Sequence, residues 1–250
     1  MDSEQPLVSV IIPTHNRPKM LVRAVESVLA QTYDNVEIVI VDDHSGSETK
    51  TVAERLAAYQ NVCYFLSDGQ GACAARNFGV KQANGVFVTG LDDDDLFTSH
   101  RIEKLVAAYE DRFSLVAARS TVFTESFCPV IDEESGRTRI FPLRRLLDNN
   151  RIGNQALIER SRFLAVGGFD TNFRARQDYD LWVRLVECYG PAKVITNKLY
   201  LRNESSLHQR ISKSSKRKRG VLQFYRKHNE KMTCIQRYKY FQLMKKTGVL

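Results

Sequence analysis

The chain has 250 residues, of which 43% are hydrophobic and 26% are charged, and these ordinary globular values exclude a collagen-like or wholly disordered protein. No apolar run reaches the roughly 18 to 20 residues that cross a bilayer, and residues 1–6 do not resemble a signal peptide. The net charge is +8, but residues 1–211 carry 25 Lys and Arg against 28 Asp and Glu, whereas residues 212–250 carry 12 against 1. The excess positive charge therefore lies in the C-terminal segment.

The first 110 residues alternate between short apolar runs and helical patterns. Apolar residues recur at helical spacing between the runs and predict helices there. Strands and helices that alternate at this spacing along the chain predict right-handed βαβ units. Such units give an α/β fold with a Rossmann-like, mainly parallel sheet and helices on both faces. The runs, rich in Val, Ile and Phe as buried strands are, are Leu7–Pro13, Val36–Asp42, Val62–Leu66 and Val86–Leu91.

Polar and charged residues follow each of these four predicted strands. Ligands of open parallel sheets bind beyond the carboxyl ends of the strands, so chemistry is expected in these turns. Four charged turns at one edge of a sheet indicate a binding site. The turns are Pro13–Arg17, Asp42–Ser45, Ser67–Gly69 with the nearby Arg76, and Asp92–Asp95.

The last of these turns contains four consecutive aspartates. Two carboxylates about 4 Å apart repel by about 1 kcal/mol in water and by several times that near a protein surface. Oxygen ligands without a nearby His or Cys suit Mg²⁺ or Mn²⁺, and a cation would remove the repulsion. We expect Asp93 to be a bystander in this cluster. The alternative is a solvated turn in which Asp95 or Ser99 caps a helix that begins near His100.

Beyond residue 112 the clearest predicted elements are a strand at Leu115–Phe123 and a helix at Asp178–Tyr189. On a helical wheel Asp178 lies on the apolar side of this helix, in its first turn. Asp180 and Arg184 lie on the opposite side and are predicted to form an ordinary exposed i, i+4 pair. Asp178 is therefore either an N-terminal cap or a partly buried functional acid.

The basic C-terminal segment, residues 212–250, is predicted to be a linker followed by an amphipathic helix. Ser212–Gly220 is a low-complexity basic run. An aromatic helix with a cationic face suits an anionic membrane surface, although it could instead pack on the rest of the chain or on another subunit. Binding to nucleic acid is not expected, because the acidic part of the chain, residues 1–211, contains no recognisable nucleic-acid-binding motif. The residues at helical spacing are Val221, Tyr225, His228, Met232, Ile235, Tyr238 and Phe241.

Five motifs, in order, resemble those of the family 2 GT-A nucleotide-sugar glycosyltransferases. The resemblance covers about residues 7–202. It implies a GT-A domain over residues 1–211, with a donor-binding half at about 7–110 and an acceptor half at about 111–211. The predicted basic helical tail at residues 212–250 follows this domain. The motifs are VSVIIPTHNR at Val8–Arg17, VDDHS at Val41–Ser45, RNFG at Arg76–Gly79, LDDDD at Leu91–Asp95, and VGGFDTNFRARQDYDLWVRL at Val166–Leu185.

The resemblance also implies roles for individual residues of the donor half. Asp43 would accept the N3–H of the nucleotide base, and Arg76 would reach the diphosphate. His15 stands where relatives often have an aromatic residue that stacks on uracil. Residues implied in nucleotide-sugar binding are Pro13, His15, Arg17, Asp43, Arg76 and Asp92.

By the same resemblance, Asp94 and Asp95 would hold Mn²⁺ or Mg²⁺ against the diphosphate, and His208 is a further candidate at the metal. Asp178 matches the catalytic base of the family and would take a proton from the acceptor hydroxyl. Gln177, before it, stands where many relatives have an acid.

These expectations describe an inverting, metal-dependent transfer from a nucleoside diphosphate sugar, a UDP-sugar, to a hydroxyl of a saccharide acceptor. The family setting suggests an acceptor on a polyprenyl diphosphate lipid in bacterial surface-polysaccharide assembly, such as O-antigen. Five cysteines without a C-x-x-C pair indicate reduced thiols and a cytoplasmic location. The basic C-terminal segment suggests a peripheral position on the inner face of the cytoplasmic membrane. Two alternatives are a sugar nucleotidyltransferase, whose Gly-rich phosphate loop with Lys is missing from Pro13–Arg17, and a non-catalytic nucleotide-sugar-binding protein.

Overall fold

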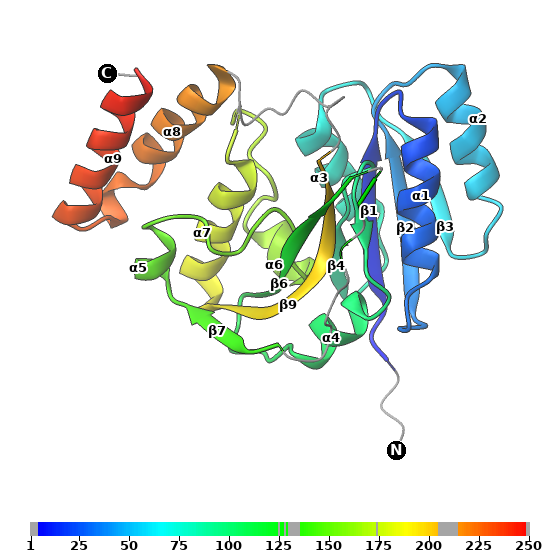
Figure 1. Cartoon of the computed structure of the whole chain (residues 1–250), viewed down its shortest axis with the longest axis horizontal. Helices are drawn as coiled ribbons and strands as arrows, with labels where there is room; N and C mark the ends of the chain where they lie inside the picture. The colour runs from blue at the N-terminus through cyan, green and yellow to red at the C-terminus, as the bar shows by residue number, and fades with distance from the viewer. Residues whose placement is uncertain are drawn as a thin grey trace.

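The computed structural model describes residues 5–124, 126, 127, 129, 136–173, 175–204 and 215–248, and within them two sheets (Figure 1). In the first, with order β3-β2-β1-β4-β8, only β8 runs antiparallel to its neighbour. In the second, β9 lies between β5 and β6 and also pairs with β7. The strands are β1 (Val8–Thr14), β2 (Val36–Asp42), β3 (Val62–Leu66), β4 (Phe87–Gly90), β5 (Leu96–Phe97), β6 (Leu115–Phe123), β7 (Thr138–Phe141), β8 (Ile158–Glu159) and β9 (Ala192–Asn203).

Helices cover both faces of the first sheet, as predicted. Helices α1 and α2 lie on one face and α3 and α6 on the other (Figure 1). The strand order and the helices on both faces confirm the α/β expectation. The described helices are α1 (Pro18–Leu29), α2 (Ser47–Leu56), α3 (Ala72–Gln82), α4 (Arg101–Ala107), α5 (Leu143–Leu146), α6 (Arg160–Ala165), α7 (Gln177–Tyr189), α8 (Ser215–His228) and α9 (Cys234–Thr247), with a 3₁₀ turn, η2, at Asn229–Lys231.

Successive residues of β1 point into two different hydrophobic cores, as a strand buried on both faces requires. Val10 and Ile12 join the core under α1, whereas Ile11 joins the core between the sheet, α3 and α7. Helix α3 packs very close to the sheet at Gly79. A Cβ atom added to this glycine would lie only 2.6 Å from the side chain of Ile11 and 2.9 Å from that of Val41, so a larger residue would not fit. The glycine of the RNFG motif thereby fixes how near Arg76, one turn earlier, lies to the strand ends.

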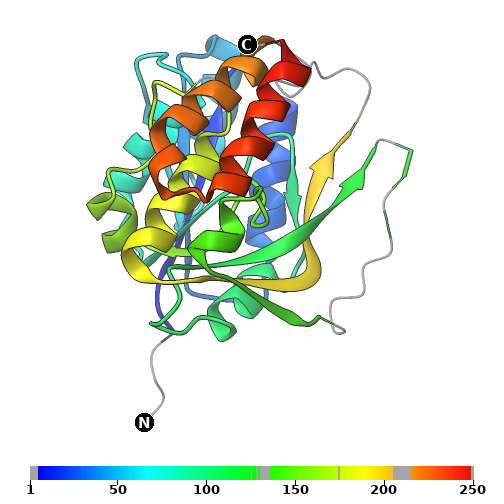
Figure 2. The ribbon, with the colours of Figure 1, turned by 90° about the vertical axis from the view of Figure 1, so that its left-hand side faces the viewer.

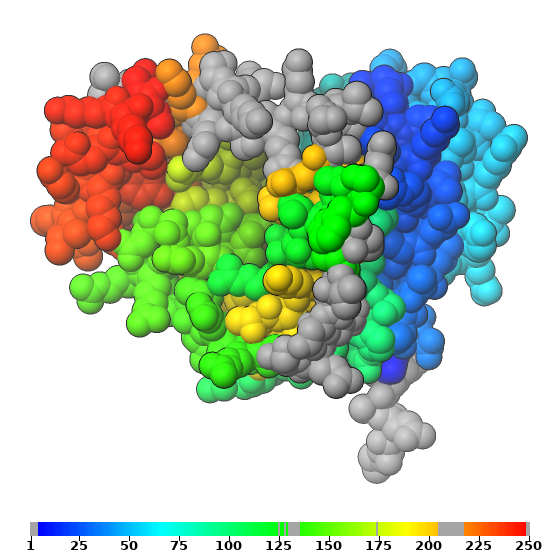
Figure 3. Space-filling view, viewed as in Figure 1, coloured from blue at the N-terminus to red at the C-terminus, as the bar shows by residue number. Residues whose placement is uncertain are grey.

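The C-terminal helices pack against the body of the protein. In Figure 2 they lie over α7, and in Figure 3 they form one end of the molecule, opposite α2. Helix α8 begins at Ser215, so the prediction that the whole of Ser212–Gly220 is a linker is wrong. Val221 and Phe224 of α8 are 1% and 0% exposed and belong to the same core as α7. None of the helices in the described part of the chain is long and apolar enough to cross a membrane.

The predicted single C-terminal helix is two helices with different buried faces. The chain breaks at η2, and Thr233 starts α9 with a capping box that includes Gln236. This break shifts the helical phase, so α9 turns Gln236, Tyr240 and Met244 inward. The sequence predicted one apolar face along the whole segment, and this prediction is wrong for α9. The three residues that continue this face in α9 are exposed: Ile235 at 69%, Tyr238 at 64% and Phe241 at 41%.

Candidate active site

The loops after β1 and β2 lie side by side, because the two strands are parallel and Thr14 pairs with Asp42. Nδ1 of His15 lies 2.8 Å from the backbone oxygen of Asp43. Asn16 links the loops further, since its backbone N–H donates to Ser45 Oγ (2.9 Å) and its side-chain oxygen accepts from the Gly46 N–H (2.8 Å). The structure thus brings two predicted nucleotide-binding residues, His15 and Asp43, into one pair of loops.

The two aspartates of the VDDHS motif differ in position. Asp42 accepts from the Ser45 N–H and the Tyr64 hydroxyl and so holds the turn in shape. Asp43 accepts from Ser67 Oγ (3.0 Å) and the Gly71 N–H (2.8 Å). A carboxylate has about four acceptor positions, so Asp43 can accept further donors.

Pro13, also predicted at this site, is buried near the end of β1, beyond Ile11, where the β1–β4 pairing stops. The absence of an N–H on Pro13 therefore costs no hydrogen bond between β1 and β4.

Three of the four consecutive aspartates form one cluster. One carboxylate oxygen each from Asp92, Asp94 and Asp95 can be chosen so that all lie within 4.8 Å of one another. The helix that follows, α4, has His100 as its N-cap residue, so neither Asp95 nor Ser99 caps it. The alternative interpretation of this turn as a helix cap is therefore wrong.

Asp93 is buried outside this cluster. Its carboxylate accepts from Thr14 Oγ1 (2.8 Å) and from Arg17 Nη1 (2.9 Å), which also lies 3.3 Å from Asp94. Arg17, predicted at the nucleotide sugar, is thus placed beside the acidic turn and partly balances its charge. Asp93 acts structurally in this arrangement, as expected of a bystander.

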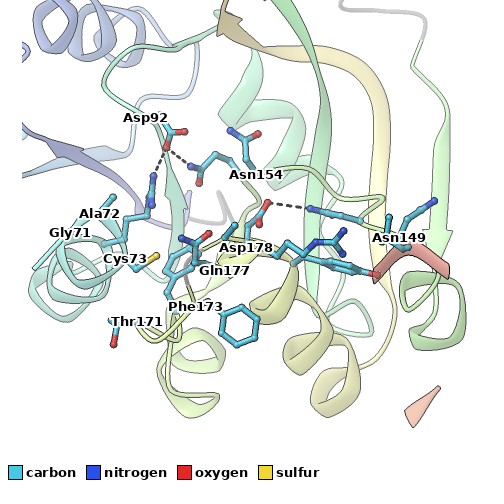
Figure 4. Close-up of a pocket in the computed structure, with 18 of the residues that line it drawn as sticks. Gly71, Ala72, Cys73, Asp92, Asn149, Asn154, Thr171, Phe173, Gln177 and Asp178 are labelled. Carbon is cyan, nitrogen blue, oxygen red and sulfur yellow. Dashed lines mark hydrogen bonds and ion pairs between the residues drawn. The ribbon is translucent and has the colours of Figure 1, made fainter. Parts of the chain in front are cut away.

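Asp92 connects the acidic cluster to α3. Its Oδ1 accepts from Arg76 Nη2 (2.5 Å) and from Gln155 Nε2 (3.0 Å), as Figure 4 shows by dashed lines at Asp92. Arg76 is therefore at the cluster, where a diphosphate held by a cation would also lie. Gln155 is a site residue that the sequence analysis missed.

Strand β9 completes the cluster from the other sheet. The Asn203 N–H donates to Asp95 Oδ1 (2.8 Å), and the Tyr200 hydroxyl lies 3.3 Å from the Asp92 nitrogen. Burial and then the charges of Asp92 and Asp94 raise the pKa of Asp95 to about 8. Arg76 and Arg17 balance part of the charge of Asp92 and Asp94, and the oxygen donors of the three acids fit a hard divalent cation.

Asp178 lies at the second residue of α7, whose N-cap is Arg176, so Asp178 is not the cap. Its side chain is half-buried, and Figure 4 shows Asp178 and Asp92 pointing into one pocket. Asn150 Nδ2 donates to Asp178 Oδ2 (3.2 Å). Burial is the main reason that the pKa of Asp178 rises to about 6, with the charge of Arg76 opposing the rise.

Asn150, which the sequence analysis also missed, is held in one orientation by its own loop. Its Oδ1 accepts from the backbone N–H groups of Ile152 (3.0 Å) and Gly153 (3.2 Å), so its NH₂ must face Gly153 O and Asp178. The indole N–H of Trp182 donates to the same Gly153 oxygen (2.9 Å). This loop therefore fixes the donor that contacts Asp178.

Asp180 is fully buried, so the prediction of an exposed Asp180–Arg184 pair is wrong. The pair itself exists, with Arg184 Nη2 at 2.8 Å from Asp180 Oδ2. Helix α8 covers this side of α7 and adds His228 Nε2 at 2.8 Å and Lys227 Nζ at 3.0 Å from Asp180 Oδ1. Although burial alone would raise it, these partners hold the pKa of Asp180 below its ordinary value.

The pocket between the two halves has a volume of about 960 Å³. Its lining includes Asp92 and Arg76 on the donor side and Asp178 on the other. Helix α9 contributes to the wall through Lys239, Tyr240 and Leu243, so the C-terminal segment is part of this cavity. His208, the remaining candidate at the metal, lies outside the described residues.

A pocket at the carboxyl edge of a Rossmann-like sheet, with Asp92 of the acidic cluster on one side and the half-buried carboxyl of Asp178 on the other, is the arrangement expected of a GT-A glycosyltransferase. Residues 9–166 match the model of the family described as Glycosyl transferase family 2. The chain belongs to this family and is a glycosyltransferase.

Two curated relatives show how far the similarity extends. The putative colanic acid biosynthesis glycosyl transferase WcaA of Escherichia coli (strain K12) is 32% identical over 95% of this chain and 87% of that protein. The GalNAc(5)-diNAcBac-PP-undecaprenol beta-1,3-glucosyltransferase of Campylobacter jejuni is 37% identical, but over 44% of this chain and 37% of that enzyme.

Two solved structures share the fold at low sequence identity. TarS of S. aureus (residues 1–349) in complex with UDP-GlcNAc has a TM-score of 0.68 and 16% identity, covering 95% of this chain and 70% of that one. The mannosyltransferase PcManGT of Pyrobaculum calidifontis, in complex with GDP-Man and Mn²⁺, has a TM-score of 0.66 and 18% identity, covering 90% and 65%. At these identities the similarity establishes the GT-A fold.

Proposed function

We propose that this protein transfers a sugar, with inversion, from a UDP-sugar to a hydroxyl of a saccharide acceptor in bacterial polysaccharide synthesis. The observation that carries the proposal is the shared pocket of Asp92 and Asp178, an acidic cluster facing a half-buried carboxyl with a raised pKa. The similarity to WcaA, named for colanic acid biosynthesis, supports the polysaccharide setting. The match to Glycosyl transferase family 2 argues against a nucleotidyltransferase and a non-catalytic binding protein, and neither of these needs a base opposite the acidic cluster.

On the donor side, the proposed contacts come from the loops after β1 and β2 and from α3. Asp43 lies between these loops and would accept the N3–H of uracil, and His15, joined to Asp43, offers a flat ring beside it. Arg76 reaches the acidic cluster and would bind the diphosphate as a permanent cation. TarS, which shares this fold, binds UDP-GlcNAc, and PcManGT binds GDP-Man, so these neighbours support a nucleoside diphosphate sugar, and the choice of uracil depends on Asp43 and on the family resemblance.

The acidic cluster is proposed to hold Mn²⁺ or Mg²⁺ through Asp94 and Asp95, with Asp92 beside them. Three carboxylate oxygens within 4.8 Å, no His or Cys among them, match the donor set of a hard cation. A bound cation would offset the negative charge that develops on the departing nucleoside diphosphate. The complex of PcManGT with GDP-Man and Mn²⁺ supports a metal in this fold.

Asp178 is proposed to be the general base. Its carboxylate takes the proton of the acceptor hydroxyl while that oxygen forms a bond to the anomeric carbon, and the bond from this carbon to the diphosphate oxygen breaks. Asn150 keeps the carboxylate oriented by donating to Oδ2. Attack opposite the leaving group inverts the anomeric centre, through a transition state resembling an oxocarbenium ion.

A panel of nucleotide sugars tests the donor. We expect UDP-sugars with Mn²⁺ to raise the melting temperature, and one of them to be hydrolysed slowly without an acceptor. The same sugars joined to CDP should give smaller shifts, because cytosine has no N3–H to donate to the carboxylate proposed to accept it, that of Asp43. A panel in which no nucleotide sugar stabilises the protein would refute the donor assignment, and release of pyrophosphate from a nucleoside triphosphate would favour the nucleotidyltransferase.

The acceptor is proposed to be lipid-linked, with the protein peripheral on an anionic membrane through α9. This helix exposes Ile235, Tyr238 and Phe241 together with basic residues, and aromatic and cationic side chains suit such a surface. The name of the Campylobacter relative, which specifies a PP-undecaprenol acceptor, supports this class.

Vesicle sedimentation tests the membrane surface. The double variant Tyr238→Ser, Phe241→Ser should lose most binding to vesicles that contain anionic lipid, because both side chains are exposed and available to the interface. Tyr59→Ser is the matched control, since Tyr59 is 53% exposed just after α2, at the other end of the molecule. Equal binding by the wild type and the double variant would refute the role of α9.

A further inference from the structure

A second hollow of about 580 Å³ lies beside the pocket and carries a concentration of arginines. We call it the arginine groove. Arg119 comes from β6, Arg139 from β7, Arg145 from α5, and Arg151 from the loop after α5. Arg119 is half-buried and the other three are exposed. The remaining lining residues are Ile140, Phe141 and Asp148.

Among the described residues, the positive charge of the arginine groove has little compensation. Asp148 is the one acid among the described lining residues, and it lies 3.4 Å from Lys239, which already offsets its charge. None of the four arginines forms an ion pair with a residue in the described ranges. Other arginines near the pocket do pair, such as Arg17 and Arg76 with the acidic cluster. Four like charges around one hollow repel each other, so an anion bound among them would be stabilised.

The arginine groove adjoins the proposed active site. Asp148 lines both hollows. Arg151 directly follows Asn150, the residue that donates to Asp178, and together with Arg119 it lines a small cavity next to the pocket. All groove residues come from the second half of the chain, which supplies the base, rather than from the loops proposed for the donor.

We propose that the arginine groove binds a phosphoryl group of the acceptor while the acceptor hydroxyl lies at Asp178. This inference rests on the proposed transferase function and names a class of acceptor for it, one with a phosphate or diphosphate outside the reacting sugar. A guanidinium forms paired hydrogen bonds with phosphate oxygens, and several guanidiniums around one hollow match the many oxygens of a diphosphate. A neutral saccharide would give these four cations no anionic partner beyond those that the described residues supply.

Site-resolved labelling of arginines tests the groove directly. Phenylglyoxal modifies accessible guanidiniums, and mass spectrometry reports the modification rate of each one. With EDTA present and no nucleotide, inorganic pyrophosphate should slow modification of Arg145 and Arg151 several-fold, whereas NaCl of the same ionic strength should not. Arg55, exposed on α2 and remote from the groove, is the matched internal control and should be unaffected. Equal rates at all three arginines with and without pyrophosphate would overturn the proposal.

Further probes identify the source of the phosphoryl group. Protection at about tenfold lower pyrophosphate than inorganic phosphate would support a diphosphate, as on a lipid carrier, and equal protection would support a single phosphate within a glycan. Protection by glucuronate but not by pyrophosphate would overturn the assignment in favour of a carboxylate.

Failure of the arginine groove can be told apart from failure of the proposed transferase function. The double variant Arg145→Gln, Arg151→Gln should keep donor hydrolysis but bind pyrophosphate more weakly than the wild type does when both are titrated by calorimetry in EDTA, while Arg55→Gln should match the wild type in both. If this binding were unchanged in the double variant, the groove proposal would fail whatever the enzyme does. If instead no donor were hydrolysed by any form, the transferase proposal would fail without affecting the labelling result.

Discussion

The Asp178→Asn variant should lose sugar transfer by about 10²- to 10⁴-fold, the range associated with removal of a general base. Asparagine keeps the size of the side chain but cannot accept the proton of the acceptor hydroxyl. Asp178 lies across the pocket from the residues proposed for the donor, so the affinity for a UDP-sugar should change little. Transfer rates and donor affinity, measured on the same preparation, check this expectation.

The pH dependence of the wild type provides an independent check on Asp178. A base must be deprotonated to act, and burial raises the pKa of this carboxyl to about 6. The kcat/KM for the acceptor should therefore be constant above this value and fall about tenfold per pH unit below it. If kcat/KM began to fall only near pH 4, or if Asp178→Asn lost donor binding, another group would be the base.

The Phe224→Ala variant should destabilise the whole protein by about 3–5 kcal/mol, a large part of the roughly 5–15 kcal/mol typical of a domain. Phe224 on α8 is 0% exposed and stacks between Tyr179 of α7 (4.1 Å between ring centroids) and Tyr240 of α9 (5.7 Å). Removing the ring leaves a cavity at the junction of all three helices. Denaturant unfolding of the full chain measures the loss.

Phe241→Ala is the matched control for this measurement. It makes the same substitution on α9 at a side chain that is 41% exposed, so its effect on the free energy of unfolding should be below about 1 kcal/mol. A small effect of Phe224→Ala, similar to that of Phe241→Ala, would mean that the C-terminal helices do not share the core of the domain.

Much of the fold could be predicted from local patterns, because its strands are continuously apolar. The predicted bounds of β2, β3 and β6 are those of the structure, and β1 differs by one residue at each end. Strand β9 was not predicted, since its sequence mixes Lys and Asn with apolar residues. It is stabilised by pairing with β5, β6 and β7, which are distant in sequence.

The acidic turn and Asp178 could be identified because their residue types are unusual at their positions. The residues that support them could not, since ordinary amides and a tyrosine provide them over long sequence separations. Gln155 reaches Asp92 from 63 residues away, and the Tyr200 hydroxyl approaches the Asp92 nitrogen from 108. The burial of Asp180 could not be predicted for the same reason: its position on the helical wheel is polar, and His228 of α8, which contacts it, lies 48 residues later in the chain.

Electron paramagnetic resonance of Mn²⁺ most directly tests whether the acidic cluster gathers a divalent cation at the donor diphosphate. The signal of free Mn²⁺ falls as the ion binds, so a titration with and without UDP gives the affinity. The wild type should remove Mn²⁺ from solution beyond the amount that UDP binds alone, and Asp94→Asn should weaken this by about tenfold or more, because it removes a charged oxygen ligand. If the wild type bound no additional Mn²⁺, or Asp94→Asn bound it equally well, the metal-dependent account would be contradicted.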